Sequence, residues 1–526
     1  MVAQNSFREK AIDEIITAIL DSEGRMDVEA LKREISKKYN LGAFIRNSEL
    51  VRRARERGYE NLIPLLRKRP MRSASGIVNI AIMTISDCPH GRCTYCPKGE
   101  GTPNSYTGFE PATMRGIQNK FNAYDQVLAR LTQLNEIGHA TDKCEVIVQG
   151  GTFLAQDPQY QDKFILDMYN ALNGGELAGS LDDAIHRNEN AKHRCIGLTI
   201  ETRPDWCFEP HVDRMLSYGA TRVEIGVQTL NPAVLIRTKR GHTLEDVWKS
   251  TQIAKDSLLK VCYHMMPGLY ASPDEDVEMF RQLFDDPHYR PDMLKIYPFL
   301  VMKGTEIYEE WKAGKIKPYS SEVAADVIAS AYKYIPYYTR VMRVQRDIPA
   351  YLIDDGVKKS NLREAVEKRL RENNTPVNEI RYREIGHNLL KGEINLDELN
   401  PELQVRRYDA SDGVEYFLSF EDKKTNLLFG FLRLRLPARP HRKEITGRSA
   451  GIRELHVYGE QLPLGERNLR SPQHSGFGKQ LMDEAERIAR EELDSDKILV
   501  ISGVGVRNYY RKLGYSLDGP YMSKRL

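Results

Sequence analysis

Residues 78–96 read VNIAIMTISDCPHGRCTYC, an apolar and β-branched run that leads directly into three cysteines. The run predicts a buried strand, and the Pro and Gly residues after it predict a loop. The three cysteines, Cys88, Cys93 and Cys96, fall within this loop. Since the chain holds seven cysteines, an odd number, a secreted disulfide framework is disfavoured and a metal or redox site is favoured.

Six further runs rich in Val and Ile follow this strand, among them CEVIVQGG, CIGLTIE and RVEIGVQT. Amphipathic stretches of helical period separate the runs, for example DKFILDMYNAL. Strands that alternate with helices indicate a parallel sheet, and six or seven such units indicate a full or partial barrel. We therefore expect an α/β fold with a partial (βα)6-type barrel over residues 76–348.

Polar or glycine residues stand where the expected strands end. They are Gly150, Gly151, Thr152, Glu201, Arg203, Glu224, Gln228, His264, Tyr297 and Gln345. Barrel enzymes build their sites at the carboxyl ends of the strands. A barrel without a site would not need polar groups there so regularly, so the pattern predicts a catalytic mouth.

Three thiolates on the loop after the first strand can hold three irons of a 4Fe–4S cluster. The fourth iron is then open to S-adenosylmethionine, and reductive cleavage of that cofactor yields a 5′-deoxyadenosyl radical. Tyr95 stands where its ring can pack beside the adenine. The spacing alone leaves a Cys3His zinc site with His90 open, and the position after the first barrel strand favours the cluster. The other four cysteines, in apolar surroundings, are interpreted as core thiols.

A different pattern of apolar and polar residues begins after about residue 400. LQVRRYDA, VEYFLSFED and LLFGFLRLRL alternate as antiparallel strands do, and RELHVYG follows them. Gln473-x-x-Gly476-x-Gly478 then opens a long amphipathic helix, where glycines let a pyrophosphate approach backbone N–H groups and the helix dipole. This turn is typical of the acyl-CoA loop of the GNAT-type N-acetyltransferase fold.

These features divide the chain into four parts. We expect a basic helical region over residues 1–75, the barrel, a charged helical connection over 349–375, and a GNAT-like, acetyl-CoA-binding α+β domain over 376–526. Residues 31–75 carry thirteen Lys or Arg against four Glu, about +9, while the whole chain carries only +3. Such asymmetry suggests a polyanionic partner, although a solvated helical face also explains a charge run.

Neither a membrane span nor a signal peptide is predicted. No segment approaches the run of roughly 20 apolar residues that a span needs. Acidic residues at positions 9, 13 and 14 interrupt the N-terminus where a signal peptide would be apolar. We therefore expect a cytoplasmic protein with no membrane partner.

From about residue 75 onward the chain resembles the catalytic subunit of Elongator, a radical S-adenosylmethionine and GNAT-type family that carboxymethylates tRNA uridine. The resemblance rests on YCPKG, SYTGFEPATMRG, QGGTF, IGLTIETRPDWC, TRVEIGVQT, HMMPG, RVQRDIPA, RELHVYG, QHSGFGKQL and SGVGVRNYYRKLGY. The cysteine spacing, CxxxxCxxC, is one residue longer than the commonest in the superfamily. NTPVNEIRYREIG contains no cysteine where many members bind zinc, so no zinc is expected in this linker.

The resemblance implies a reaction with two cofactors at the wobble uridine of a tRNA anticodon stem-loop. The deoxyadenosyl radical would take hydrogen from the methyl group of acetyl-CoA. The carbon radical would add to C5 of uridine, and thioester hydrolysis would leave 5-carboxymethyluridine. The basic N-terminal region would bind the phosphates of the tRNA.

The resemblance also implies roles for individual residues. Gly150, Gly151 and Thr152 would meet the methionine end of S-adenosylmethionine, with Glu201, Arg203 and Gln228 of the rim as further cofactor contacts. On the acetyl-CoA side, Lys143 would reach over from the barrel, and Glu454, Leu455, His456 and Val457 would line the cofactor beside the loop of Gln473, Gly476, Phe477 and Gly478. The candidate catalytic residues are Lys143, His456, Tyr509 and Tyr510, of which either tyrosine could stand at the CoA end.

Two rival hypotheses remain. A protein lysine acetyltransferase would use only the C-terminal domain, with Glu454 as its base, and would leave the cysteines unused. A tRNA-binding protein with a structural cluster would lose folding, not turnover, when Cys93 is replaced. The sequence leaves open which tRNAs are chosen, which protein donates electrons, and whether a homodimer forms.

Overall fold

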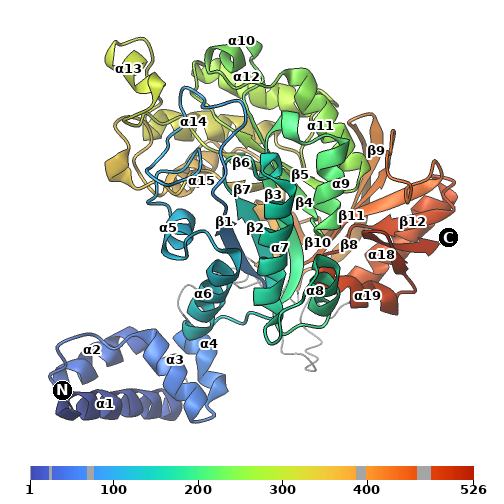
Figure 1. Cartoon of the computed structure of the whole chain (residues 1–526). Helices are drawn as coiled ribbons and strands as arrows, with labels where there is room; N and C mark the ends of the chain where they lie inside the picture. Colours follow the sequence, from blue (N-terminus) through green and yellow to red (C-terminus); the bar gives the residue numbers. More distant parts are fainter. Residues whose placement is uncertain (1, 23–25, 68–75, 387–397, 459–475) are drawn as a thin grey trace.

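The computed structural model of the chain describes residues 2–22, 26–67, 76–386, 398–458 and 476–526, which form three parts (Figure 1). A small helical bundle lies at the N-terminus, a curled parallel sheet surrounded by helices lies in the middle, and a second sheet with two helices lies at the C-terminus. None of the described helices combines the length and the apolar character that a bilayer crossing requires.

The N-terminal bundle has its own small hydrophobic core. Its helices are α1 (Val2–Asp21), α2 (Val28–Lys38), α3 (Asn47–Glu56) and α4 (Ile63–Leu66). Carboxylates of α1 pair with part of the basic stretch: Asp13 with Arg57 at 2.9 Å, and Glu14 with Lys38 at 2.6 Å. The excess positive charge of the region is therefore partly neutralised from within.

The central sheet contains seven parallel strands in the order of the chain, which confirms the expected α/β half-barrel and adds a short seventh strand to the six-unit type. The strands are β1 (Val78–Met83), β2 (Lys143–Gln149), β3 (Arg194–Thr202), β4 (Arg222–Gln228), β5 (Lys260–Met265), β6 (Met293–Ile296) and β7 (Arg340–Arg343).

Helices separate these strands and cover the outer face of the sheet (Figure 1). They are α5 (Pro111–Gln118), α6 (Ala123–Glu136), α7 (Pro158–Asn173), α8 (Leu181–Asn188), α9 (Glu209–Ser217), α10 (Pro232–Arg237), α11 (Leu244–Asp256), α12 (Pro273–Asp285), α13 (Glu306–Lys312) and α14 (Ser321–Ala331), followed by α15 (Leu362–Glu372) and α16 (Ile380–Arg383). Side-chain caps mark their starts: Asp157 accepts from Gln159 N at 2.9 Å before α7, and Ser272 forms a capping box before α12.

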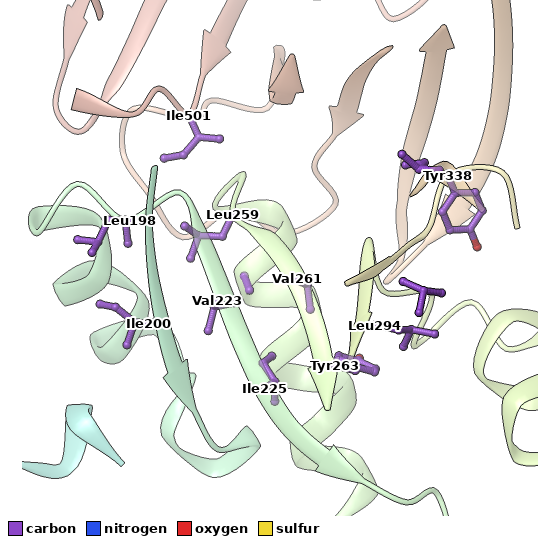
Figure 2. Packing of buried hydrophobic residues seen from close by; sticks show 14 of the residues in the cluster. Leu198, Ile200, Val223, Ile225, Leu259, Val261, Tyr263, Leu294, Tyr338 and Ile501 are labelled. Carbon is purple, nitrogen blue, oxygen red and sulfur yellow. The ribbon is translucent and has the colours of Figure 1, made fainter. Parts of the chain in front are cut away.

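The two faces of the central sheet differ in chemistry. Because side chains alternate along a strand, one set faces the helices and the other faces the inside of the half-barrel. Figure 2 shows the outer set, apolar and fully buried, with Leu198, Val223 and Val261 in one cluster. The inner set on β4 is Arg222, Glu224, Gly226 and Gln228. An ordinary barrel fills its interior with bulky branched residues, so this polar interior indicates a function.

The C-terminal sheet has the strand order β13-β14-β12-β11-β10-β9-β8. Its elements are β8 (Pro401–Ala410), β9 (Gly413–Asp422), β10 (Leu427–Leu436), β11 (Ser449–Val457), α18 (Phe477–Glu491), β12 (Lys497–Val500), α19 (Arg507–Lys512), β13 (Ser516–Asp518) and β14 (Tyr521–Arg525). The parallel strands β11 and β12 pair only between 449–452 and 497–500. The amide of Ile501 also donates to the carbonyl of Ile452 at 3.1 Å, just past the end of β12.

One hydrophobic core runs through the half-barrel and the C-terminal sheet, so the two share their interior (Figure 2). The C-terminal domain lies against the amino ends of the barrel strands. Tyr521 donates from its hydroxyl to the carbonyl of Ser257 at 3.1 Å, and Arg453 donates to the carbonyl of Leu259 at 2.7 Å, both just before β5. The cysteine loop follows the carboxyl end of β1, so it lies at the opposite end of the sheet.

A buried ionic cluster joins the two sheets. Arg453 is the extra residue of a β-bulge, since Leu434 pairs with Ile452 and Arg433 with Glu454. The bulge turns Arg453 toward the barrel, where it binds Asp292 at 2.9 Å, while Glu415 of β9 binds it from the C-terminal sheet at 2.8 Å. All three side chains are fully buried.

Neighbouring cations belong to the same cluster. Arg433 lies 3.8 Å and Lys255 lies 3.9 Å from Asp292. Burial lowers the pKa of Lys255 to about 8, whereas the surrounding cations hold the pKa of Asp292 well below its usual range. The cluster places more positive than negative charge around Asp292, so this carboxylate is the group on which the contact depends.

We predict that Arg453→Ala lowers the free energy of unfolding by about 3–5 kcal/mol, because it breaks the buried pair with Asp292 and leaves this carboxylate only the more distant Arg433 and Lys255, at 3.8 and 3.9 Å. Urea unfolding followed by circular dichroism measures this change. The control is Arg487→Ala on α18, whose exposed ion pair with Glu484 contributes at most about 1 kcal/mol. Equal losses in the two variants would contradict a supporting role for the buried cluster.

Candidate functional site

The cysteine loop lies against the glycines that end β2. The amide of Gly151 donates to the carbonyl of Ser86 at 3.1 Å, at the start of the loop. A Cβ atom on Gly150 would lie 2.3 Å from Thr84 Oγ1, and one on Gly151 would lie 2.4 Å from the carbonyl oxygen of Ser86. Only glycine permits this approach, so Gly150 and Gly151 serve to bring the end of β2 against the cysteine loop.

The three cysteine side chains lie in a common, largely buried environment. Thr152 donates from its hydroxyl to Cys88 Sγ at 3.4 Å, and His90 Nε2 lies 3.3 Å from Cys93 Sγ. Burial, with added repulsion from the charges of Cys93 and Cys88, raises the pKa of Cys96 to about 12. A thiol of this kind ionises only when a cation takes the place of its proton.

Two observations favour an iron–sulfur cluster over one zinc ion. Within the described part of the chain, the only three metal-binding side chains with ligand atoms inside 4.8 Å of one another are Glu224, Cys262 and His264. The loop thiols are therefore more widely spaced than the ligands of a single tetrahedral ion. His90 also accepts a hydrogen bond from Arg203 at 2.9 Å, which occupies the nitrogen nearest to Cys93.

Arg240 is a buried cation beside this loop that the sequence did not reveal. Its guanidinium donates to Cys93 Sγ at 3.7 Å and to the carbonyl of Gly226. Among the described residues it has no carboxylate partner, and its Nε–H group makes no hydrogen bond. An uncompensated buried guanidinium is costly, so this site fits anionic groups: cluster thiolates and the carboxylate of a ligand. The TKRGH segment gives no sign of burial, which explains the omission.

The expected rim residues surround the same mouth. Glu201 accepts hydrogen bonds from Gln149 at 3.0 Å and Tyr106 at 3.1 Å, and lies 3.4 Å from Lys295 Nζ. Gln228, at the end of β4, has a φ of +73°, a strained conformation for a residue with a side chain.

Arg203 binds Asp205 at 2.8 Å and points to His90. Tyr95 is buried beside Arg240 and Cys93, whose charges act on its hydroxyl. Both residues therefore belong to the surroundings of the cysteine loop, where a bound cofactor would contact them.

One expectation about the rim was wrong. Glu224 lies in the middle of β4, on its inner face, and not at the strand end. It is fully buried and bonds to His264 at 2.8 Å and to Lys295. Because Lys295 already supplies the positive charge, the Glu224, Cys262 and His264 group is an ion-pair network and not a vacant metal site.

The glycine turn of the C-terminal domain opens α18. Gly476 caps the helix in the left-handed region, with a φ of +74°. A Cβ atom on Gly478 would lie 3.2 Å from the Tyr509 hydroxyl and 3.7 Å from Val457, so these three residues surround one spot. Gln473 lies outside the described residues. Phe477 stacks on Phe420 at 4.4 Å and therefore packs in the core.

The remaining candidates of the C-terminal domain are the two tyrosines, His456 and Glu454. Tyr509 is exposed, whereas Tyr510 is buried and packs against Tyr515, so the structure does not place Tyr510 at a cofactor. His456 contacts Tyr458, and burial lowers its pKa. Glu454 is held by Arg433 at 2.8 Å.

Lys143 begins β2 at the barrel end nearest to the C-terminal domain, and burial lowers its pKa. Leu455 lies on β11 between Glu454 and His456, half-buried, where strand alternation turns it to the opposite face. The candidate residues thus gather at both ends of the half-barrel: the cysteine loop with its rim at one end, and Lys143 with the β11 residues at the other.

Comparison with known proteins identifies the family of the chain. A family model of the radical SAM superfamily matches residues 82–284, the Radical_SAM C-terminal domain matches residues 291–372, and the ELP3 N-terminal domain matches residues 8–74. The tRNA uridine(34) acetyltransferase of Methanocaldococcus jannaschii is 49% identical over 509 residues, which cover 95% of this chain and 94% of that protein.

Further relatives extend the match. Elongator complex protein 3 of Saccharomyces cerevisiae is 44% identical over 516 residues, covering 95% of this chain and 92% of the yeast protein. The structure of archaeal Methanocaldococcus infernus Elp3 with an N-terminal deletion is 46% identical, with a TM-score of 0.76, and covers 86% of this chain and 100% of that one. The chain therefore belongs to the Elongator complex protein 3 family of radical S-adenosylmethionine proteins.

Proposed function

We propose that this protein forms 5-carboxymethyluridine at the wobble position of tRNA, with acetyl-CoA as the carbon source and S-adenosylmethionine as the radical source. The proposal depends mainly on one observation: two sites share one continuous hydrophobic core. One site is the cysteine loop with the buried Arg240, which has no carboxylate partner among the described residues, and the other is the GNAT-type glycine turn. The relatives named tRNA uridine(34) acetyltransferase support tRNA as the substrate.

At the barrel mouth, Cys88, Cys93 and Cys96 would hold a 4Fe–4S cluster. When bound, that cluster supplies the electron that cleaves S-adenosylmethionine to the deoxyadenosyl radical. Arg240 would bind the carboxylate of the methionine part, because its charge has no carboxylate partner among the described residues. Because Gly150 has no Cβ atom, the end of β2 can lie against Thr84 and Ser86, which lead into the cysteine loop.

At the other end, the amides of the glycine turn would bind the pyrophosphate of acetyl-CoA. The Tyr509 hydroxyl lies beside Gly478 and would contact the thioester end. His456, on β11 beside Glu454, would accept a proton from a water that attacks the thioester. Lys143 would act from the barrel side.

The tRNA would bind the basic N-terminal region. Arg33, Lys37, Arg46, Arg52 and Arg55 lie on α2, on α3 and between these helices. Their guanidinium and ammonium groups can neutralise phosphates, and such binding weakens with salt.

The lysine acetyltransferase hypothesis is less well supported. Its base would be Glu454, but this carboxylate is paired with Arg433, and the charges of Arg433 and Lys260 hold its pKa low. A base of that kind accepts a proton poorly.

We predict that the protein, reconstituted anaerobically with iron and sulfide and given a reductant, both cofactors and tRNA, makes 5-carboxymethyluridine that mass spectrometry of nucleosides detects. Cys93→Ala removes a cluster ligand and is expected to abolish the product. The matched control, Cys144→Ala, changes a buried core thiol and keeps the product. Acetylated protein with unmodified tRNA would favour the acetyltransferase hypothesis instead.

We predict that Arg240→Gln weakens the binding of S-adenosylmethionine by at least about tenfold, since a charged hydrogen bond contributes about 1.5–3 kcal/mol. Isothermal calorimetry on iron-loaded protein measures this affinity. Arg237→Gln, an exposed arginine paired with Glu310, is the control and should bind normally. Equal affinities in both variants would show that Arg240 does not meet the cofactor.

We predict that Tyr509→Phe lowers product formation by roughly tenfold or more, because it removes a hydroxyl at the acetyl-CoA site without changing the core. Tyr510→Phe is the matched control and should keep activity, since that ring packs against Tyr515. The product is measured in the tRNA assay and stability by thermal melting. An activity loss confined to Tyr510→Phe would reverse the assignment.

A further inference from the structure

The two cofactor sites lie at opposite ends of the half-barrel strands, so a reaction between them needs a path. The β2 strand alone takes six steps from Lys143 to Gln149, which at about 3.3 Å per step is roughly 20 Å. An acetyl group held at Gly478 and Tyr509 is therefore far from the cysteine loop.

Solvent reaches the inner face of β2 along its full length. Glu145, Ile147 and Gln149 are half-buried, and the Glu145 side chain is 24% exposed. On the outer face of the same strand, Cys144, Val146 and Val148 are 0% exposed. The inner face of β2 is thus accessible to solvent, whereas its outer face is closed.

Rows of inner side chains connect the two ends. Nearest to the C-terminal domain, Glu145 lies beside Gly197, and the charge of Glu145 acts on His456 across the domain boundary. The next row is Ile147, Thr199, Arg222 and Lys260, and the charge of Lys260 acts on Glu454. The next row toward the mouth is Gln149, Glu201 and Glu224.

Thr199 lies in the middle row of these inner side chains. Its side chain is on the inner face, because it pairs with Ile147 on one side and Arg222 on the other. The Thr199 hydroxyl is buried and makes no hydrogen bond among the described residues. A buried hydroxyl without a partner is rare, and it suggests a ligand that supplies one.

We propose that the inner face of the half-barrel, from Glu145 past Thr199 to Gln149 and Glu201, receives the acyl thioester arm of acetyl-CoA and delivers the acetyl group to the cysteine loop. The arm carries amide groups, which need hydrogen-bonding partners, and this face supplies them. The inference rests on the proposed function for its product but predicts a binding property that can be tested without it.

The test fills the path at Thr199. Thr199→Trp places a large ring beside Ile147 and Arg222, and Thr199→Ser, which keeps the hydroxyl and adds no bulk, is the matched control. Calorimetry without iron compares acetyl-CoA with 3′-phosphoadenosine 5′-diphosphate, the nucleotide end of CoA without its arm. We expect the tryptophan variant to bind acetyl-CoA about tenfold more weakly than the serine variant and the nucleotide equally well.

With the cluster and tRNA present, the tryptophan variant should still cleave S-adenosylmethionine to 5′-deoxyadenosine, while 5-carboxymethyluridine falls by about 100-fold. If the tryptophan variant fails to fold, Gly197→Val makes the same test one row nearer to the C-terminal domain, where a Cβ atom lies 3.4 Å from Glu145.

Equal binding of acetyl-CoA by the filled and control variants would overturn the inference. A failure of the proposed function looks different: the unaltered chain would make no 5-carboxymethyluridine, yet the arm-specific loss of binding would remain.

Discussion

The pairing of Asp292 with Arg453 determines how the two halves of the molecule face each other. Both side chains are fully buried, and each comes from a different sheet. The β-bulge at Arg453 makes the contact possible, because a regular strand would turn this side chain away from the barrel. Since a buried charge needs its partner, the C-terminal domain has one stable position beneath the barrel strands. Every relation between the two sites follows from that position.

Side chains alternate along each strand of the half-barrel, so the residues of the hydrophobic core and the residues of the site lie on opposite faces of the sheet. Leu198, Val223 and Val261 face the helices and form the core, while Glu201, Glu224 and Lys295 face inward. A change of one residue in register would exchange these sets and destroy both the core and the site. The interior can therefore be polar without loss of stability, because the outer face supplies the hydrophobic burial.

The sequence predicted the fold class and the cysteine loop because both have local signals: apolar runs of strand length and three closely spaced thiols. The glycine turn before α18 was predicted for the same reason. The burial of Arg240 depends on its contact with Cys93, which is distant in the sequence. The mid-strand position of Glu224 depends on where β4 begins and ends, and the burial of Tyr510 depends on how its helix packs. The bulge at Arg453 depends on the register between β10 and β11, which the residue types alone do not predict.

The most direct test uses acetyl-CoA with a fully deuterated acetyl methyl group, together with S-adenosylmethionine, reductant and tRNA. The 5′-deoxyadenosine that forms is analysed by mass spectrometry. If both ends of the half-barrel serve one reaction, deuterium from the methyl group appears in 5′-deoxyadenosine whenever tRNA is modified. Modified tRNA accompanied by deuterium-free 5′-deoxyadenosine would contradict the account, because the radical would then have taken its hydrogen elsewhere.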